Sequence, residues 1–144
     1  MLHRFRSEEP LYCLDYNLSG DTFAAGGKDP AITVFDELKK CEKVVLRAGA
    51  RERAGHWNRV FALKFDPEAP HLLASAGWDK IVNLWDLRSG KAELQTLGPY
   101  VCGDAIDIKA NKLAIGSYRT EDVLEIYDKR KLKKEFVIPW NHPD

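Results

Sequence analysis

Apolar and polar residues alternate in short runs along the chain, and three stretches share one pattern. Residues 22–36 (TFAAGGKDPAITVFD) align without a gap on residues 72–86 (LLASAGWDKIVNLWD), and residues 112–128 (KLAIGSYRTEDVLEIYD) follow the same plan with a two-residue insertion. Each stretch has an apolar run, a turn of small and polar residues, an alternating run and a final aromatic-Asp pair. Because a period of two is typical of half-buried strands, each stretch predicts two strands joined by a turn.

Each of these stretches is flanked by further apolar segments. The upstream segments are residues 11–16, 60–65 and 104–108, and the downstream segments are residues 43–46, 92–97 and 134–139. A unit therefore holds four short strands, and the chain holds three such units. Units that recur along a chain indicate a repeat architecture, in which each unit buries its apolar face against a neighbour.

Residues 121–136 also fit an amphipathic helix, because Val123, Ile126 and Leu132 approach helical spacing. The aligned part of the second unit carries Ser89-Gly90 between its two apolar runs, which is a signal for a hairpin turn. We therefore expect strands here rather than a helix.

The second unit closely resembles a WD repeat, through Gly55-His56, Ser75, Asp79 and Trp85-Asp86. The first and third units resemble a WD repeat more loosely, so the resemblance covers about residues 11–138 in all. It implies an all-β fold, a partial β-propeller of three four-stranded antiparallel blades, within a single WD-repeat region over residues 1–144. The expected blades cover approximately residues 11–46, 60–97 and 104–139.

The number of blades bears on the shape of the molecule. Closed propellers have roughly four to eight blades, so three blades predict an open arc, or part of a larger ring. We expect further blades from a longer chain, or a second copy, to complete it. The two end blades should then each present an apolar face that no other blade covers.

His56, Ser75 and Asp79 could be either a hydrolase triad or internal struts. A nucleophilic serine needs an exposed, strained elbow, whereas Ser75 lies within the apolar run LLASAG. The resemblance implies a buried structural tetrad of these three residues and Trp85. Such a chain would satisfy the imidazole and the indole N–H, which need partners when buried. We therefore expect no catalytic residue and no enzyme.

The outer units depart from this pattern. The first has Ser7, Ala25 and Phe35 in place of the His, Ser and Trp, and the third has Pro99, Ile115 and Tyr127. We expect both outer blades to rely on apolar packing instead.

The composition of the chain limits the kinds of partner, cofactor and location that we expect. The 144 residues carry 22 Lys and Arg against 22 Asp and Glu, so no net field recruits nucleic acid or an acidic membrane. The four histidines lack metal-ligand spacing, so neither a metal nor a cofactor is expected. Three widely spaced cysteines and the absence of a secretory signal favour the cytoplasm, with the nucleus as the alternative. The basic residues of 129–134 are interpreted as a solvated hairpin loop, with a nucleic-acid patch as the disfavoured alternative.

Two functional hypotheses remain. Aromatic and arginine residues in turns predict a protein-binding rim formed by Trp57, Arg59, Trp78, Tyr118 and Arg119. This favours a non-catalytic interaction scaffold whose partners are other proteins. The alternative rests on Trp85-Asp86-Leu87-Arg88, which resembles the Trp-Asp-x-Arg box of substrate receptors of cullin–RING ubiquitin ligases, with Arg88 as the adaptor contact.

Overall fold

Twelve strands form three four-stranded antiparallel sheets in the computed structural model, which describes residues 3–50 and 54–140. The first sheet, blade 1, contains β1 (Leu11–Tyr16), β2 (Thr22–Gly27), β3 (Ile32–Asp36) and β4 (Cys41–Leu46). Blade 2 contains β5 (Val60–Phe65), β6 (Leu72–Gly77), β7 (Ile81–Asp86) and β8 (Lys91–Leu97). Blade 3 contains β9 (Ile106–Lys109), β10 (Lys112–Gly116), β11 (Leu124–Asp128) and β12 (Lys133–Val137). The predicted all-β class with three antiparallel sheets is confirmed.

Residues 121–136, for which a helix was the alternative, form most of β11 and β12 instead. Leu132 has a positive φ of 49° in the turn between these strands, a backbone conformation that a helix does not contain. Within the described residues, nothing forms a helix long and apolar enough to cross a membrane.

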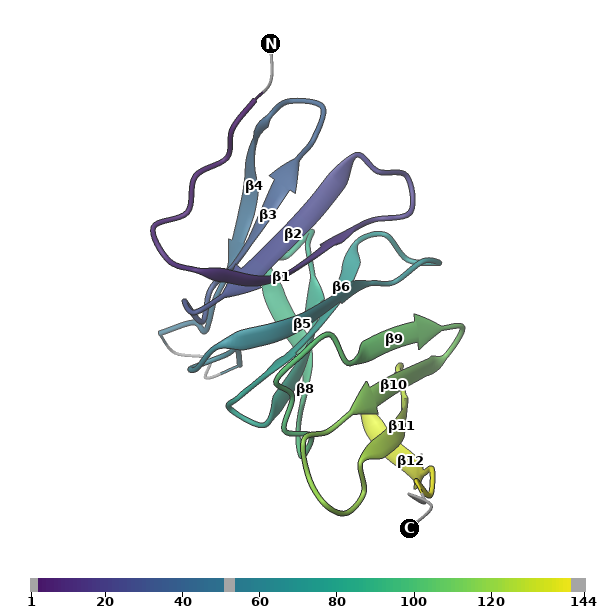
Figure 1. Cartoon of the computed structure of the whole chain (residues 1–144). Helices are drawn as coiled ribbons and strands as arrows, with labels where there is room; N and C mark the ends of the chain where they lie inside the picture. The colour runs from purple at the N-terminus through teal and green to yellow at the C-terminus, as the bar shows by residue number, and fades with distance from the viewer. Residues whose placement is uncertain (1–2, 51–53, 141–144) are drawn as a thin grey trace.

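The blades are arranged like a fan, as Figure 1 shows. The first strand of each blade contacts the first strand of the next, so that β5 lies between β1 and β9. The fan is not closed, because blades 1 and 3 lie at its two ends, with blade 2 between them (Figure 1).

Both contacts between blades pair an aliphatic face with an aromatic-bearing face. Between blades 1 and 2, Ile32 and Val34 pack with Val60, Leu73 and Trp85. Between blades 2 and 3, the aliphatic face of blade 2 packs against the face of blade 3 that bears Tyr127; this cluster includes Val82, Leu84, Leu113, Ile115 and Tyr127. The blades therefore stack with one polarity.

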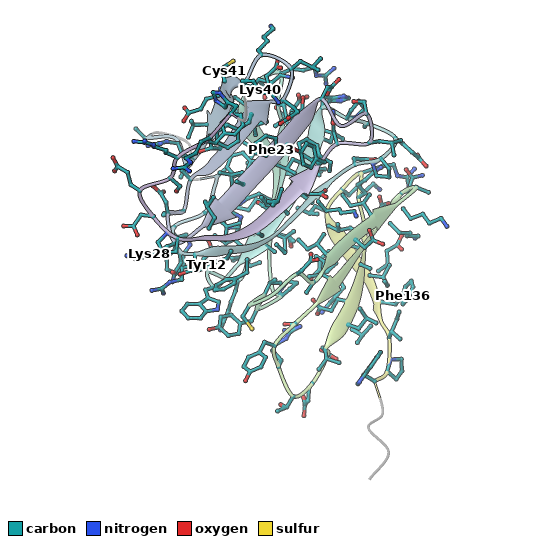
Figure 2. The ribbon with its side chains drawn as sticks, turned by 45° about the horizontal axis from the view of Figure 1, so that its top comes forward. Tyr12, Phe23, Lys28, Lys40, Cys41 and Phe136 are labelled. Carbon is teal, nitrogen blue, oxygen red and sulfur yellow. The ribbon has the colours of Figure 1, made fainter. Side chains whose placement is uncertain are left out.

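The two end faces carry the unpaired halves of this arrangement. On blade 1, Phe5 from the segment before β1 covers Phe23 and Phe35, with ring centroids 5.3 and 4.7 Å apart. On blade 3, Phe136 pairs across the sheet with Ile126 and is 51% exposed. Figure 2 shows Phe23 and Phe136 on the two end blades. An apolar surface therefore remains open on blade 3, while Phe5 covers part of the end face of blade 1.

A β-bulge at the start of β5 brings the backbone very close to Gly77. The register shifts between Val60 and Ala62, and the Trp78 N–H donates to the Arg59 carbonyl at 3.0 Å. A Cβ on Gly77 would lie 2.0 Å from that same carbonyl oxygen. Blade 1 repeats the arrangement, since a Cβ on Gly27 would lie 2.1 Å from the Pro10 carbonyl oxygen. Glycine is therefore required at the end of the second strand in both blades.

We expect Gly77→Ala to lower the free energy of unfolding by about 1–3 kcal/mol, because the added methyl group forces the bulge to move. Gly103→Ala is the control, since a Cβ there has no neighbour within 4 Å. Urea denaturation of both variants measures the difference. Equal stability of the two variants would show that the bulge tolerates a side chain.

Candidate functional site

The side chains of His56, Ser75, Asp79 and Trp85 form one continuous hydrogen-bonded chain inside blade 2. His56 Nδ1 lies 2.8 Å from Asp79 Oδ2, and His56 Nε2 lies 2.7 Å from Ser75 Oγ. The Trp85 indole N–H donates to Ser75 Oγ at 2.8 Å. With the Nδ1 proton donated to Asp79, Nε2 accepts the Ser75 hydroxyl proton, so every polar group of the chain has a partner.

Backbone geometry directs His56 into the blade. Gly55 has φ of +145°, and a Cβ there would lie 2.6 Å from backbone atoms of Ala48, so only glycine fits. The Asp79 carboxylate also accepts the backbone N–H groups of Trp57 and Ile81, both at 3.1 Å. This one carboxylate therefore fixes both the entry to β5 and the turn between β6 and β7.

The burial of Ser75 does not suit a nucleophile. Ser75 is 0% exposed and its oxygen already contacts both His56 and Trp85. A substrate carbonyl therefore has no path to Oγ in this conformation. No three His, Cys, Asp or Glu side chains gather as a metal site anywhere in residues 3–50 and 54–140.

Blade 1 has a hollow of about 320 Å³ lined in part by the residues that align with the tetrad, Ser7, Ala25, Asp29 and Phe35. Asp29 keeps only part of the role of its counterpart, since its Oδ1 accepts the Ala31 N–H at 2.8 Å. A serine and an alanine have less side-chain volume than the His56 and Ser75 pair of blade 2.

Blade 3 contains a buried ionic network in place of the tetrad. The Tyr127 hydroxyl donates to Glu125 Oε2 at 2.9 Å, and Lys134 and Arg119 each lie 3.0 Å from Glu125 Oε1. The Glu125 side chain is 1% exposed. Burial alone would raise the pKa of Glu125, but the hydrogen bonds from Lys134, Tyr127 and Arg119 outweigh it and lower the pKa below its usual value. Blade 3 thus differs from the expectation of apolar packing alone.

One feature of the sequence repeat indicates this network, namely a polar residue two positions before the final aromatic residue of each unit. Glu125 lies two residues before Tyr127, on the same side of its strand, where Asn83 precedes Trp85 in blade 2 and Thr33 precedes Phe35 in blade 1. In blades 2 and 3 this position is buried, since Asn83 is 0% and Glu125 1% exposed, and a buried polar side chain needs a polar partner.

Exposed aromatic side chains lie on loops of the adjacent blades 2 and 3. Trp57 is 69% exposed, Trp78 36% and Tyr118 75%. The Arg59 guanidinium lies over the Trp78 ring, 4.7 Å from its centroid. The Tyr118 N–H donates to the Tyr100 carbonyl at 2.7 Å. Val101, which follows Tyr100, donates its N–H to the Gly77 carbonyl at 3.3 Å. The loop of blade 3 that carries Tyr118 therefore lies beside the turn of blade 2 that carries Trp78.

Arg119 differs from the other residues predicted for this rim. Its Nη2 contacts Glu125 and donates to the Asp122 carbonyl at 3.0 Å, so this nitrogen already has partners inside blade 3. The prediction also omitted Tyr12 and Phe61, whose rings stack 4.9 Å apart, and Phe61 in turn lies 5.2 Å from Trp78. Both residues lie at β-bulges, which the alternating pattern does not locate (Tyr12 is labelled in Figure 2).

Arg88 lies in the turn after β7, at the other end of the blade from Trp78. Its guanidinium donates to both carboxylate oxygens of Asp86, with its Nη2 2.7 Å from Oδ2. Arg130 repeats this fork on Asp128. Hydrogen bonds from these arginines lower the pKa of Asp86 and of Asp128 to about 2. Each Asp-x-Arg pair therefore fastens its own turn.

The basic residues of 129–134 are largely neutralised. Three of them pair with carboxylates: Lys129 with Asp66, Arg130 with Asp128 and Lys134 with Glu125. Among the described residues, only Lys131 and Lys133 of this cluster lack an ion pair, which is a weak basis for binding a polyanion.

The family model described as "WD domain, G-beta repeat" matches residues 50–86, the part of the chain that contains the tetrad. The chain is a WD-repeat protein. It is 30% identical to "THO complex subunit 3" of Arabidopsis thaliana over 94% of its own length and 45% of that protein. It is 32% identical to "U3 small nucleolar RNA-associated protein 21" of Saccharomyces cerevisiae over 62% of the chain and 9% of that protein.

A solved structure supports the same fold. The β-propeller domain of Cps50 (Swd1) from Myceliophteria thermophila superposes with a TM-score of 0.76, at 22% identity, over 94% of this chain and 40% of that one. The WD-repeat chain therefore has a β-propeller architecture, and it spans less than half the length of each of these proteins.

We expect Ser75→Ala to lower the free energy of unfolding by about 1–3 kcal/mol, because it leaves the buried Trp85 indole N–H and His56 Nε2 without their partner. Adding Trp85→Phe removes the orphaned donor and reproduces the Ala25–Phe35 combination of blade 1. The double variant should therefore lose less stability than the two single changes together, with a coupling of about 0.5–3 kcal/mol in a double-mutant cycle. Additive losses would contradict a shared hydrogen-bond chain.

We expect the Glu125 network to make blade 3 sensitive to acid. Because the pKa of Glu125 is lowered in the folded state, its carboxylate stabilises the fold above the ordinary glutamate pKa of about 4.3, and this contribution is lost as the pH falls further. Glu125→Gln should be less stable than wild type at pH 7 and should lose less stability between pH 5 and 3. Urea midpoints measure this, with exposed Glu68→Gln as the control; a wild-type acid profile in Glu125→Gln would contradict the network.

Proposed function

We propose that this WD-repeat protein is a non-catalytic scaffold that binds other proteins through the rim formed by Trp57, Arg59, Trp78 and Tyr118. The observation that carries the proposal is the exposure of Trp57 and Tyr118, which are 69% and 75% exposed and lie in loops of adjacent blades. Trp, Tyr and Arg are the residues that most often dominate the energy of protein interfaces. Arg119, also predicted for this rim, contributes by holding its loop on Glu125.

The absence of catalysis is part of the proposal. The only Ser-His-Asp arrangement suggested by the sequence is buried and fully hydrogen-bonded, as a structural tetrad requires. "THO complex subunit 3" is, by its name, a subunit of a complex, which supports a scaffold role in this chain too. We propose the cytoplasm or the nucleus as its location.

The uncovered end faces support a further part of the proposal. Blade 1 presents the face with Phe23 and Phe35, partly covered by Phe5, and blade 3 presents the opposite face, which bears Ile126 and the exposed Phe136. These two faces correspond to the two halves that pair between neighbouring blades. We propose that further blades complete the ring, from a longer chain in preference to a second copy, since the chain covers only 45% of its plant relative.

The alternative function is that of a substrate receptor that docks on a ubiquitin-ligase adaptor through Trp85-Asp86-Leu87-Arg88. The Arg88 side chain is 70% exposed, which favours contact with a partner. Its Nε and Nη2 donate to Asp86, so docking through these atoms would have to share or replace that pairing.

One capture experiment separates the two functions. We expect Trp57→Ala and Tyr118→Ala to abolish most protein capture in affinity purification with mass spectrometry, because both remove exposed contact surface without opening the core. Leu38→Ala is the matched control, since Leu38 is a 79% exposed apolar residue in the opposite turns. Arg88→Ala should retain the captured proteins. Loss of a ligase adaptor in Arg88→Ala alone would favour the receptor, and identical capture by all variants would contradict the rim.

A further inference from the structure

Arg59 and Lys80 lie at the rim with aromatic rings as their neighbours. The Arg59 guanidinium lies 4.7 Å from the centre of the Trp78 ring, and the Lys80 ammonium lies 5.9 Å from the centre of the Tyr100 ring. Neither forms an ion pair with a carboxylate of the described residues. By contrast, Lys28 pairs with Glu9 at 2.9 Å, and Arg119 pairs with Glu125.

We propose that the rim is a binding site for an acidic peptide segment, with Arg59 and Lys80 as the receptors for its carboxylates. The inference rests on the proposed protein-binding function and specifies its partner. A guanidinium that lies over an indole ring can still donate two hydrogen bonds from its edge to one carboxylate. Because the rings hold both cations, less side-chain entropy is lost on binding.

The aromatic surface beside these cations fits apolar side chains of the same peptide. Trp57 lies just before Arg59 in the chain, and its backbone N–H is fixed by Asp79. Tyr118 is fixed on the other side by the Tyr100 carbonyl. Exposed rings on a rigid backbone provide contact area at a low entropic cost. The expected ligand therefore alternates Asp or Glu with Phe or Leu.

A single-stranded nucleic acid fits this surface less well than a peptide. Its affinity depends on neutralising many successive phosphates along a cationic groove. Arg59 and Lys80 have no ion pair with a carboxylate of the described residues, but two cations do not make such a groove. Arg59 and Lys80 can instead neutralise the charge of one or two carboxylates of a peptide.

The test is to pan a phage-displayed library of random peptides against the wild-type chain. We expect the selected peptides to be enriched in Asp and Glu next to aromatic or aliphatic residues. Synthetic copies of the selected peptides should bind Arg59→Gln and Lys80→Gln at least about tenfold more weakly, the loss expected for one charge-assisted hydrogen bond. Lys131→Gln, an exposed lysine in the turn between β11 and β12, is the matched control and should bind like wild type.

The outcomes separate this inference from the proposed function. Neutral or basic peptides that bind wild type but not Trp57→Ala would preserve the rim as a protein-binding site and overturn its acidic specificity. Acidic peptides that bind Arg59→Gln and Lys80→Gln unchanged would also overturn it. Selection of no peptide, or tighter binding of single-stranded oligouridylate than of any selected peptide, would contradict both proposals.

Discussion

The fold of blade 2 depends on the buried imidazole of His56, which links the turn after β6 to β6 itself. One ring nitrogen contacts Asp79 in the turn after β6, and the other contacts Ser75 within β6, which in turn binds the Trp85 indole on β7. Three elements of blade 2 are therefore joined by one buried polar chain. Because an unpaired group in that chain costs about 1–3 kcal/mol, the arrangement favours a single register of the strands.

The same hydrogen-bonded side chains position two surfaces: the interface with blade 1 and the loop that carries Trp57. The Trp85 ring packs into the interface with blade 1, so its orientation decides how the first two blades meet. The Asp79 carboxylate accepts the Trp57 N–H, so it also fixes the loop that presents Trp57 and Arg59. The proposed binding rim therefore depends on a buried acid that no ligand can reach.

Blades 1 and 3 are stabilised by other interactions around the position that Trp85 occupies in blade 2. Blade 1 replaces the polar chain with Ala25 and Phe35, which leave nothing unpaired but also leave a hollow. Blade 3 uses Tyr127 and a buried Glu125 that is neutralised by two cations. These solutions explain why one unit matches the WD repeat closely while its neighbours keep the sheet without the motif. The period of apolar residues maintains the sheet, and the polar residues only have to satisfy one another.

This division also determines what could be predicted from the sequence. The strands and their order follow from a period of two and from the internal alignment, and both of these are local properties. The identity of the tetrad residues followed from the resemblance. The polar residue Glu125 before Tyr127 indicated a buried contact, but its partners Arg119 and Lys134 could not be predicted, because the alternating pattern does not specify which loops and strands meet there. The position of Tyr12 and Phe61 depends on bulges, which shift the register without changing the alternation.

The exchange rate of the tryptophan indole protons tests the buried chain most directly. The chain has four tryptophans, of which Trp57, Trp78 and Trp140 are exposed and Trp85 is 0% exposed. In ¹⁵N-resolved NMR hydrogen exchange, the Trp85 indole N–H should exchange only through unfolding of the blade, and so far more slowly than the other three. Exchange of all four indoles at similar rates would show that the Ser75–Trp85 bond is not maintained and that the blade is held in another way.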